Sequence, residues 1–409
     1  MVVRILSSVF FTQLGVKERY LGYLNLLGIP WNLKFLWAPI LDGWGTKRGW
    51  QIALQAAIGV LTCLIGVLSY MAALAVDPNL LLQVICGVFI ALAFVSATND
   101  IAIDGYYLHA IPSRAEQALL SGYRVLAYRL AMVFSRSVIV GLVGWIAGAY
   151  FGGQPLRAWA IGFLLSGGTM LLLSLIHRSI LPKVEESVTT RGRLDDALEL
   201  FRQGFLTYLH QPKVHLVLAF IILYKLGDEI LFSLVTPFML RELGVSMIQY
   251  AWISGLVGAF ATVAGAIFGG WLIKQMSLRR ALWPLTIGMN LNIWLYVWLA
   301  STKPSPSEAS GLTTITLIHG IEQFAAGLGN AALLVFLLTT CAKQFRATHY
   351  AIGSAIMSIP GTIVGSRAGA IVEAFGYTNL YIFAFLASIP SMLLIPFVPI
   401  REGEEEHAS

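Results

Sequence analysis

Eleven apolar stretches follow one another along the chain, each close to the roughly 20 residues that a helix needs to cross the hydrocarbon core of a bilayer. The sequence therefore predicts an all-α polytopic membrane protein. The expected spans are 20–41, 51–75, 80–110, 117–149, 158–178, 213–240, 247–273, 280–300, 312–341, 349–373 and 378–399.

Composition supports this class, since 57% of the 409 residues are hydrophobic and 12% are charged. The net charge of +6 comes from basic residues in short connections, where they set topology rather than form a nucleic-acid surface. Cys63, Cys86 and Cys341 stand singly, without the spacing of a metal site or a disulfide framework. No catalytic order of serine, histidine and acid is visible either. We therefore expect no enzyme, no cofactor, no metal and no nucleic-acid partner.

Residues 1–16 are too short to cross a bilayer and lack the cleavage site of a signal peptide. We interpret them as the outer half of a first helix whose beginning is missing, within a plan of twelve spans. Connections rich in lysine and arginine are expected on the cytoplasmic side, together with the acidic tail 401–409. These connections are 42–50, 111–116, 178–213, 274–280 and 342–348.

A long polar linker, 179–212, divides the chain into an N-terminal bundle, 1–178, and a C-terminal bundle, 213–400. An internal repeat supports this division. With the chain shifted by 232 positions, Lys47 and Arg48 align with Arg279 and Arg280, and other residues align at the same offset. Parallel repeats of six helices are typical of major facilitator transporters. The further matches are Leu41 with Ile273, Arg114 with Arg346, Ala115 with Ala347, and Gly144 with Gly376.

The linker contains apolar residues at helical spacing, which indicates an interfacial helix that bridges the two bundles. A plain solvated linker is nearly as compatible with its composition. The apolar residues are Leu194, Leu198, Phe201 and Phe205.

The turn after the 20–41 span carries a small residue, then Asp42, a glycine, and the basic pair Lys47 and Arg48. This order fits a gating motif of major facilitator transporters, in which the acid and the bases pair in one state and separate in the other. In the second half, Lys274 stands where Asp42 would repeat. Only the first copy is therefore expected to form the ionic contact.

Four runs resemble those of the AmpG-type permeases of the major facilitator superfamily, whose relatives include acetyl-CoA transporters. They are KFLWAPILDGWGTKRGW, SATNDIAIDG, AYRLAM and YKLGDEILFSL. The resemblance covers most of 20–395 and implies proton-coupled import of anhydro-muropeptides for cell-wall recycling. Asn99 and Asp100 stand where the family commonly has a glutamine and an aspartate.

Charged residues at membrane depth are costly and are functional candidates by default. Arg129 lies twelve residues into its span, or about 18 Å from its start at the rise of an α-helix. An arginine stays protonated and suits carboxylate or phosphate groups. We therefore expect Arg129 to bind an anionic substrate; an ion pair with Asp100 or Asp104 is an equal alternative. The weaker substrate-binding candidates are Arg124, Arg136, Asn99, Asp100 and Arg367.

Proton coupling needs a group that gains and loses a proton at depth. Asp228, Glu229 and Glu322 fit this role, with Asp104 as a further candidate. Because Lys225 precedes Asp228 and Glu229 by one helical turn, a local ion pair is the simpler interpretation of those two. His319 and His109 are weaker candidates.

Other polar residues are interpreted as packing or anchoring groups. Lys34 is expected to reach the lipid headgroups. Trp159 and Tyr381 are expected to anchor span ends at the membrane interface.

Three hypotheses follow. The first is a proton-driven importer of an anionic cell-wall fragment, monomeric, in a bacterial inner membrane. The second is a transporter of acyl-CoA or another acidic metabolite. The third is a scaffold that keeps the fold without transport.

Overall fold

The computed structural model describes residues 2–111, 114–183, 199, 202–342 and 346–400. Within these ranges the secondary structure is helical, without strands. Seven described helices are long and apolar enough to cross a membrane. The predicted all-α polytopic class is therefore confirmed, and several of the other predicted spans appear as shorter helical pieces in series.

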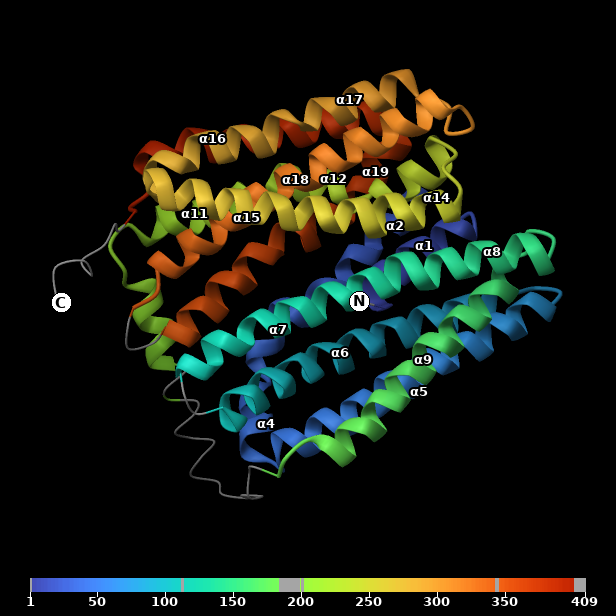
Figure 1. Ribbon diagram of the computed structural model, residues 1–409, viewed down its shortest axis with the longest axis horizontal. Coiled ribbons are helices and arrows are strands. Elements are labelled where there is room, and N and C mark those ends of the chain that lie inside the picture. The colour runs from blue at the N-terminus through green and yellow to red at the C-terminus, as the bar shows by residue number, and fades with distance from the viewer. Residues whose placement is uncertain (1, 112–113, 184–198, 200–201, 343–345, 401–409) are drawn as a thin grey trace. The chain divides into compact units, whose positions relative to one another are not determined.

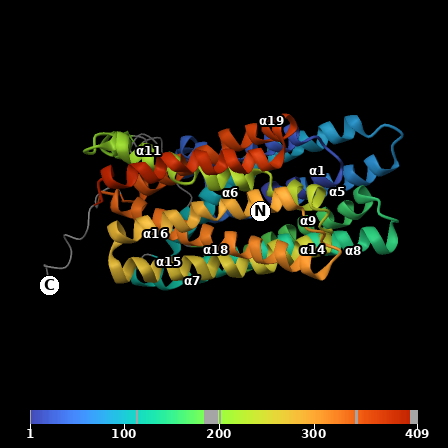
Figure 2. The same cartoon turned by 90° about the horizontal axis from the view of Figure 1, so that it is seen from above.

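The chain divides into two compact units (Figures 1 and 2). Unit 1 comprises Met1–Gly15, Leu27–Leu200 and Ser246–Gly255. Unit 2 comprises Val16–Leu26, Phe201–Val245 and Leu256–Ser409. Each unit thus includes a short segment from the other half of the sequence. The division into bundles at 178 and 213 stays a prediction.

In unit 1, long helix α5 packs along both α6 and α9. The contact with α9 is close because glycines face it: a Cβ on Gly167 would lie 2.7 Å from the carbonyl oxygen of Gly59. Small residues at such spacings let membrane helices approach each other. The long elements of this unit are α5 (Lys47–Leu74), α6 (Asn79–Ala110), α7 (Arg114–Val133), α8 (Val140–Tyr150) and α9 (Pro155–Ile180).

The N-terminal part of the chain consists of short helices. The predicted span 20–41 is broken where Pro30 and Pro39 occur, because proline lacks an N–H and disfavours helical backbone before it. The segment that unit 2 takes from this part packs against α19. The pieces are η1 (Val2–Leu6), α1 (Ser7–Gln13), α2 (Glu18–Tyr23), η2 (Leu24–Gly28), α3 (Ile29–Leu33), η3 (Lys34–Leu36) and α4 (Ala38–Gly43).

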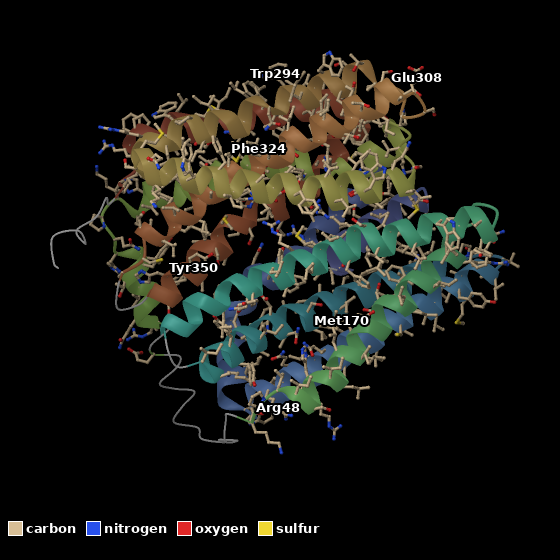
Figure 3. All side chains as sticks on the ribbon, in the orientation of Figure 1. Arg48, Met170, Trp294, Glu308, Phe324 and Tyr350 are labelled. Atoms are coloured by element: carbon tan, nitrogen blue, oxygen red, sulfur yellow. The ribbon has the colours of Figure 1, made fainter. Side chains whose placement is uncertain are left out.

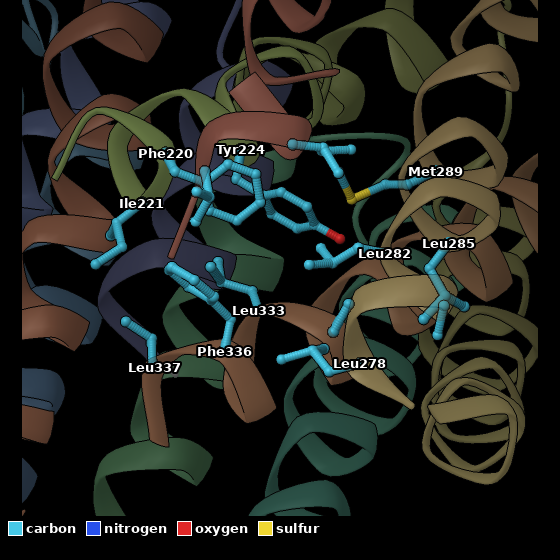
Figure 4. Packing of buried hydrophobic residues seen from close by; sticks show 14 of the residues in the cluster. Phe220, Ile221, Tyr224, Leu278, Leu282, Leu285, Met289, Leu333, Phe336 and Leu337 are labelled. Atoms are coloured by element: carbon cyan, nitrogen blue, oxygen red, sulfur yellow. The ribbon is translucent and has the colours of Figure 1, made fainter. Parts of the chain in front are cut away.

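Unit 2 has a buried apolar core in which Phe220 and Tyr224 pack beside Phe336 (Figure 4). Leu278, Leu282 and Met289 complete it from one helix. Its long elements are α11 (Val214–Tyr224), α12 (Leu226–Ser233), α15 (Gly258–Met276), α16 (Leu278–Leu291), α17 (Ile293–Thr302), α18 (Ala309–Thr339) and α19 (Arg346–Leu394). The shorter elements are α13 (Val235–Pro237), η5 (Phe238–Glu242), and η8 (Ile395–Phe397).

Two local findings refine the predictions. Helix α19 has a non-helical residue, Gly376, at φ 79°, which separates the predicted spans 349–373 and 378–399. The repeat aligns helix starts, since Lys47 begins α5 and Arg279 lies at the start of α16. The repeat does not extend to the local structure at Gly376. Gly376 is non-helical, whereas its aligned residue Gly144 lies inside helix α8.

The predicted interfacial helix lies largely outside the described residues, including Leu194, Leu198 and Phe201. Phe205 lies in a described helix over 202–209. In that helix Tyr208 is buried, with its ring centroid 5.2 Å from that of His349. The described helix of the linker is therefore part of unit 2 and partly buried in it, rather than fully solvated.

Candidate functional site

A buried acidic cluster lies in unit 2, where the chain breaks between α11 and α12. Lys225 occupies the break and is non-helical, at φ −100° and ψ 5°. Its Nζ lies 3.2 Å from a carboxylate oxygen of Asp228 and 3.5 Å from one of Glu229. The side chains of Lys225 and Asp228 are 12% and 4% exposed, and that of Glu229 is 27% exposed. The local ion pairs expected from the spacing are therefore present.

Helix α18 adds Glu322 to this cluster. Glu322 is only 1% exposed, and the charges of Asp228 and Lys225 act on its carboxyl group. Gln323 donates to a Glu322 oxygen at 3.3 Å and accepts from the hydroxyl of Thr262 on α15 at 2.9 Å. The acidic cluster, defined as Lys225, Asp228, Glu229 and Glu322, thus contains three carboxyl groups and one ammonium group.

This imbalance has a chemical consequence. A buried charge without a balancing partner costs several kcal/mol, so buried carboxyl groups in excess of the cations are more stable when they hold a proton. Among the described residues, no group of three or more histidines, cysteines and acids is arranged to hold a metal ion. The cluster is suited to reversible binding of a proton.

Close packing holds the acidic cluster together. A Cβ on Gly361 of α19 would lie 2.1 Å from a carboxylate oxygen of Glu229. A Cβ on Gly265 of α15 would lie 1.9 Å from the carbonyl oxygen of Phe324 on α18. Figure 3 shows Phe324 beside the α15 ribbon. Glycine at both positions therefore lets the neighbouring helices approach the acids.

Two ion pairs of unit 1 are partly exposed to solvent. Arg124 on α7 forms an ion pair with Asp104 on α6, with side chains 42% and 48% exposed. The Arg124 guanidinium also lies 4.4 Å from the centroid of the Tyr107 ring, a cation–π geometry. Lys34 pairs with Asp100 at 2.5 Å, so it does not simply reach toward headgroups as the sequence suggested.

Arg129 and Arg136 differ from Arg124. Each has a buried Nε without a hydrogen-bond partner among the described residues. The Oδ1 of Asn99 is likewise buried without a partner among them. Arg129 makes one weak contact, from Nη1 to the Met132 sulfur at 3.9 Å. Arg129 does not form the alternative ion pair with Asp100 or Asp104. Asp100 instead contacts Lys34, and Asp104 contacts Arg124. Buried polar atoms of Arg129, Arg136 and Asn99 thus lack hydrogen-bond partners among the described residues.

Lys47 and Arg48, which the sequence predicted as gating residues, donate to backbone carbonyls. Lys47 is buried and donates to the Leu41 oxygen at 2.7 Å. Arg48, labelled in Figure 3, donates to the Leu181 oxygen at 2.8 Å, beyond the end of α9. The side chains of Asp42 and His109 lie outside the described residues, so the predicted ionic contact of Asp42 stays a prediction. Arg367 is exposed on α19 in unit 2.

Two predicted interface anchors are wrong. Tyr381 and Trp159 are fully buried. Trp159 packs against Phe10 and Phe163, and Tyr381 packs against Phe238 and Tyr296. Position near a span end suggested anchoring, but helix packing encloses both rings. His319 is also buried, and its Nδ1 lies 2.8 Å from the Tyr296 hydroxyl oxygen.

Comparison with known proteins agrees with this architecture. A family model described as Acetyl-coenzyme A transporter 1 matches residues 6–177. An anhydromuropeptide permease of Escherichia coli is 29% identical over 391 residues, covering 94% of this chain and 74% of the permease.

Two solved structures share the fold. A D-xylose-proton symporter superposes with a TM-score of 0.65 at 13% sequence identity. The alignment covers 98% of this chain and 93% of the symporter chain. A POT family transporter in complex with 5-aminolevulinic acid has a TM-score of 0.66 at 13% identity and covers 96% and 95%. The predicted major facilitator fold is confirmed. The apolar helices and the permease relative support a multi-pass membrane transporter.

Proposed function

We propose that this chain, for which the comparisons support an AmpG-type permease of the major facilitator superfamily, is a proton-coupled importer of an anionic solute. The observation that carries the proposal is the acidic cluster, with its one ammonium group among three carboxyl groups. We place the protein in a bacterial inner membrane as a monomer.

The coupling step is assigned to Glu322, with Asp228 and Glu229 as its neighbours. Glu322 is the most deeply buried acid of the cluster and belongs to a different helix from Lys225. If the Lys225 ammonium stays with Asp228, Glu322 binds and releases the transported proton. A small movement of α12 against α18 would change the charge that Glu322 experiences, and thus its proton affinity.

Anion binding is assigned to Arg129 in unit 1, supported by Arg136 and Asn99. These groups have buried polar atoms that lack a partner among the described residues, and leaving such atoms unpaired costs free energy. A carboxylate or phosphate accepts hydrogen bonds from a guanidinium in a favourable planar geometry. Arg124 and Asp100 have partners already, so we assign them to support rather than to primary contact. Arg367 is kept as a secondary candidate for anion binding, and Asp104 as a secondary candidate for proton coupling.

The proposed cargo is an anhydro-muropeptide, as in the Escherichia coli relative's name. An acyl-CoA is the second candidate, because the matching family model is described as an acetyl-coenzyme A transporter. Both are anions, and the guanidinium of Arg129 suits either. Competition between the two in one uptake assay distinguishes them.

Transport in proteoliposomes tests the proposal. Labelled anhydro-muropeptide should accumulate inside when the outside is acidic. When the pH gradient is collapsed, its inside concentration should rise no further than the outside concentration. Arg129→Ala should raise KM by about tenfold, equivalent to about 1.4 kcal/mol of binding free energy. Arg19→Ala is a matched control, since Arg19 is paired with Glu373 and has no part in the proposed site.

Accumulation that is unchanged without a pH gradient would overturn proton coupling. Absence of any uptake by folded protein, with cellular activity intact in both Arg129→Ala and Glu322→Gln, would favour the scaffold hypothesis instead.

A further inference from the structure

We propose that Tyr377, Tyr381, Tyr296 and His319 form a proton route through unit 2, from the turn at Gly376 to Glu322. The proposal rests on the proposed proton coupling and adds the path by which the proton reaches its site. All the residues of the route belong to unit 2.

The route begins in a group of charged residues near the turn. Arg241 forms an ion pair with Glu18 at 3.2 Å, and Lys303 forms one with Glu242. Lys303 follows the end of α17, and Tyr377 follows Gly376 directly. The charges of Glu18, Glu242 and Arg241 act on the Tyr377 hydroxyl, so this phenol lies beside the charged group. The partly exposed carboxylates of Glu18 and Glu242 can collect protons from water.

The middle of the route consists of buried phenols. The ring centroids of Tyr377 and Tyr381 are 6.3 Å apart, and those of Tyr381 and Tyr296 are 5.3 Å apart. The hydroxyls of Tyr377 and Tyr381 are buried and have no hydrogen-bond partner among the described residues. A buried hydroxyl normally has a partner, so two such groups in sequence need an explanation. A phenol can donate and accept at once, which is what a proton relay requires.

The route ends at Glu322. The Tyr296 hydroxyl oxygen lies 2.8 Å from Nδ1 of His319, and the donor in this hydrogen bond depends on the histidine tautomer. His319 precedes Glu322 by three residues on α18, so the two side chains lie on one helical face. Four groups act on the Tyr381 hydroxyl by their charge, namely Tyr296, Tyr377, Glu322 and Glu242. Tyr381 is thus electrostatically connected to both ends of the route.

The transfer is balanced at each step. Tyr377 accepts a proton at its oxygen while its own hydroxyl proton passes to Tyr381, and Tyr381 passes one to Tyr296 in the same way. His319 accepts a proton at Nδ1 from Tyr296 and gives up the proton on its other nitrogen toward the Glu322 carboxylate. Each relay group ends with the number of protons it had at the start, and Glu322 gains one. Rotation of the phenols and the imidazole then restores the initial hydrogen positions.

A pH-jump experiment on the full-length protein in lipid tests the route without any cargo. The carbonyl band of protonated Glu322 is identified by infrared difference spectroscopy as the band that Glu322→Gln removes. Its rise after acidification on the side of Gly376 gives the protonation rate. Tyr381→Phe and Tyr296→Phe should slow this rate by about tenfold or more, a barrier increase of about 1.4 kcal/mol or more. Both changes keep the ring and remove only the hydroxyl.

Tyr208→Phe is the matched control, because Tyr208 is a fully buried phenol of unit 2 outside the route. Its protonation rate should equal that of the wild type. Equal rates in Tyr381→Phe, Tyr296→Phe and wild type would overturn the route. A wild type that shows the Glu322 band but no pH-driven uptake would overturn the proposed function and leave the route supported.

Discussion

The two units treat charge in opposite ways. In unit 1, Arg124 and Asp104 form a one-to-one pair that is close to half exposed. In unit 2, Lys225 and the acids of the cluster are largely removed from solvent, and acids outnumber the base. An exposed pair needs no proton to be stable, whereas a buried excess of carboxyl groups does. This difference is the basis of our proposal that unit 1 recognises the ligand and unit 2 handles the proton.

The largest effect is expected from Lys225→Met. This change removes the single ammonium group of the acidic cluster and leaves the buried acids unbalanced. Breaking a buried pair from one side costs about 3 to 5 kcal/mol. The midpoint of thermal unfolding in detergent should fall markedly, and Asp228→Asn in the same protein should restore part of the loss. No decrease in the single variant would show that unit 2 does not depend on this balance.

Glu322→Gln is expected to reduce pH-driven accumulation by about 100-fold, or about 2.7 kcal/mol, because an amide cannot carry the proton. Counterflow of labelled against unlabelled anhydro-muropeptide should persist, since it needs no net proton movement. Glu308→Gln is the control: Glu308 is exposed and stands immediately before α18, as Figure 3 shows at the end of that helix. Parallel loss of counterflow in Glu322→Gln would indicate a structural role instead.

Gly265→Ala is expected to destabilise unit 2 by disturbing the packing of α15 against α18. Its Cβ would meet the Phe324 carbonyl oxygen at 1.9 Å, so α15 and α18 must separate next to Gln323 and Glu322. Overpacking of this kind costs about 1 to 3 kcal/mol. Gly270→Ala lies on the same helix with no atom within 4 Å and should leave stability unchanged or slightly raised. Thermal unfolding of the two variants, measured side by side, checks the difference.

The smallest effect is expected from Asp104→Asn in unit 1. Because the Arg124–Asp104 pair is close to half exposed, its loss should change the free energy of unfolding by less than about 1 kcal/mol. The cation–π contact of Arg124 with Tyr107 would persist. A loss as large as that from Lys225→Met would remove the distinction between the units.

The sequence predicted the helical spans well, because length and hydropathy alone decide which segments can cross lipid. The Lys225 pairs with Asp228 and Glu229 were also predictable, since they lie one helical turn apart. Joining Glu322 to them was not, because about ninety residues separate them in the sequence. Sequence distance likewise hid the contact of Tyr296 with His319.

Two errors have a common physical cause. Tyr381 and Trp159 were assigned to the interface from their places near span ends, yet both are buried. Hydropathy gives the depth of a residue along its helix but not the direction in which its side chain faces. For Lys34, depth suggested the headgroups, whereas the neighbouring helix supplied Asp100 as a partner.

The most direct test of the account is proton movement during cargo transport. Proteoliposomes with a pH-sensitive dye outside and no imposed gradient receive anhydro-muropeptide. We predict that the external medium becomes more alkaline as cargo enters, and that Glu322→Gln abolishes this signal while Glu308→Gln retains it. Cargo entry without alkalinisation, or alkalinisation that survives Glu322→Gln, would contradict the assignment of proton coupling to unit 2.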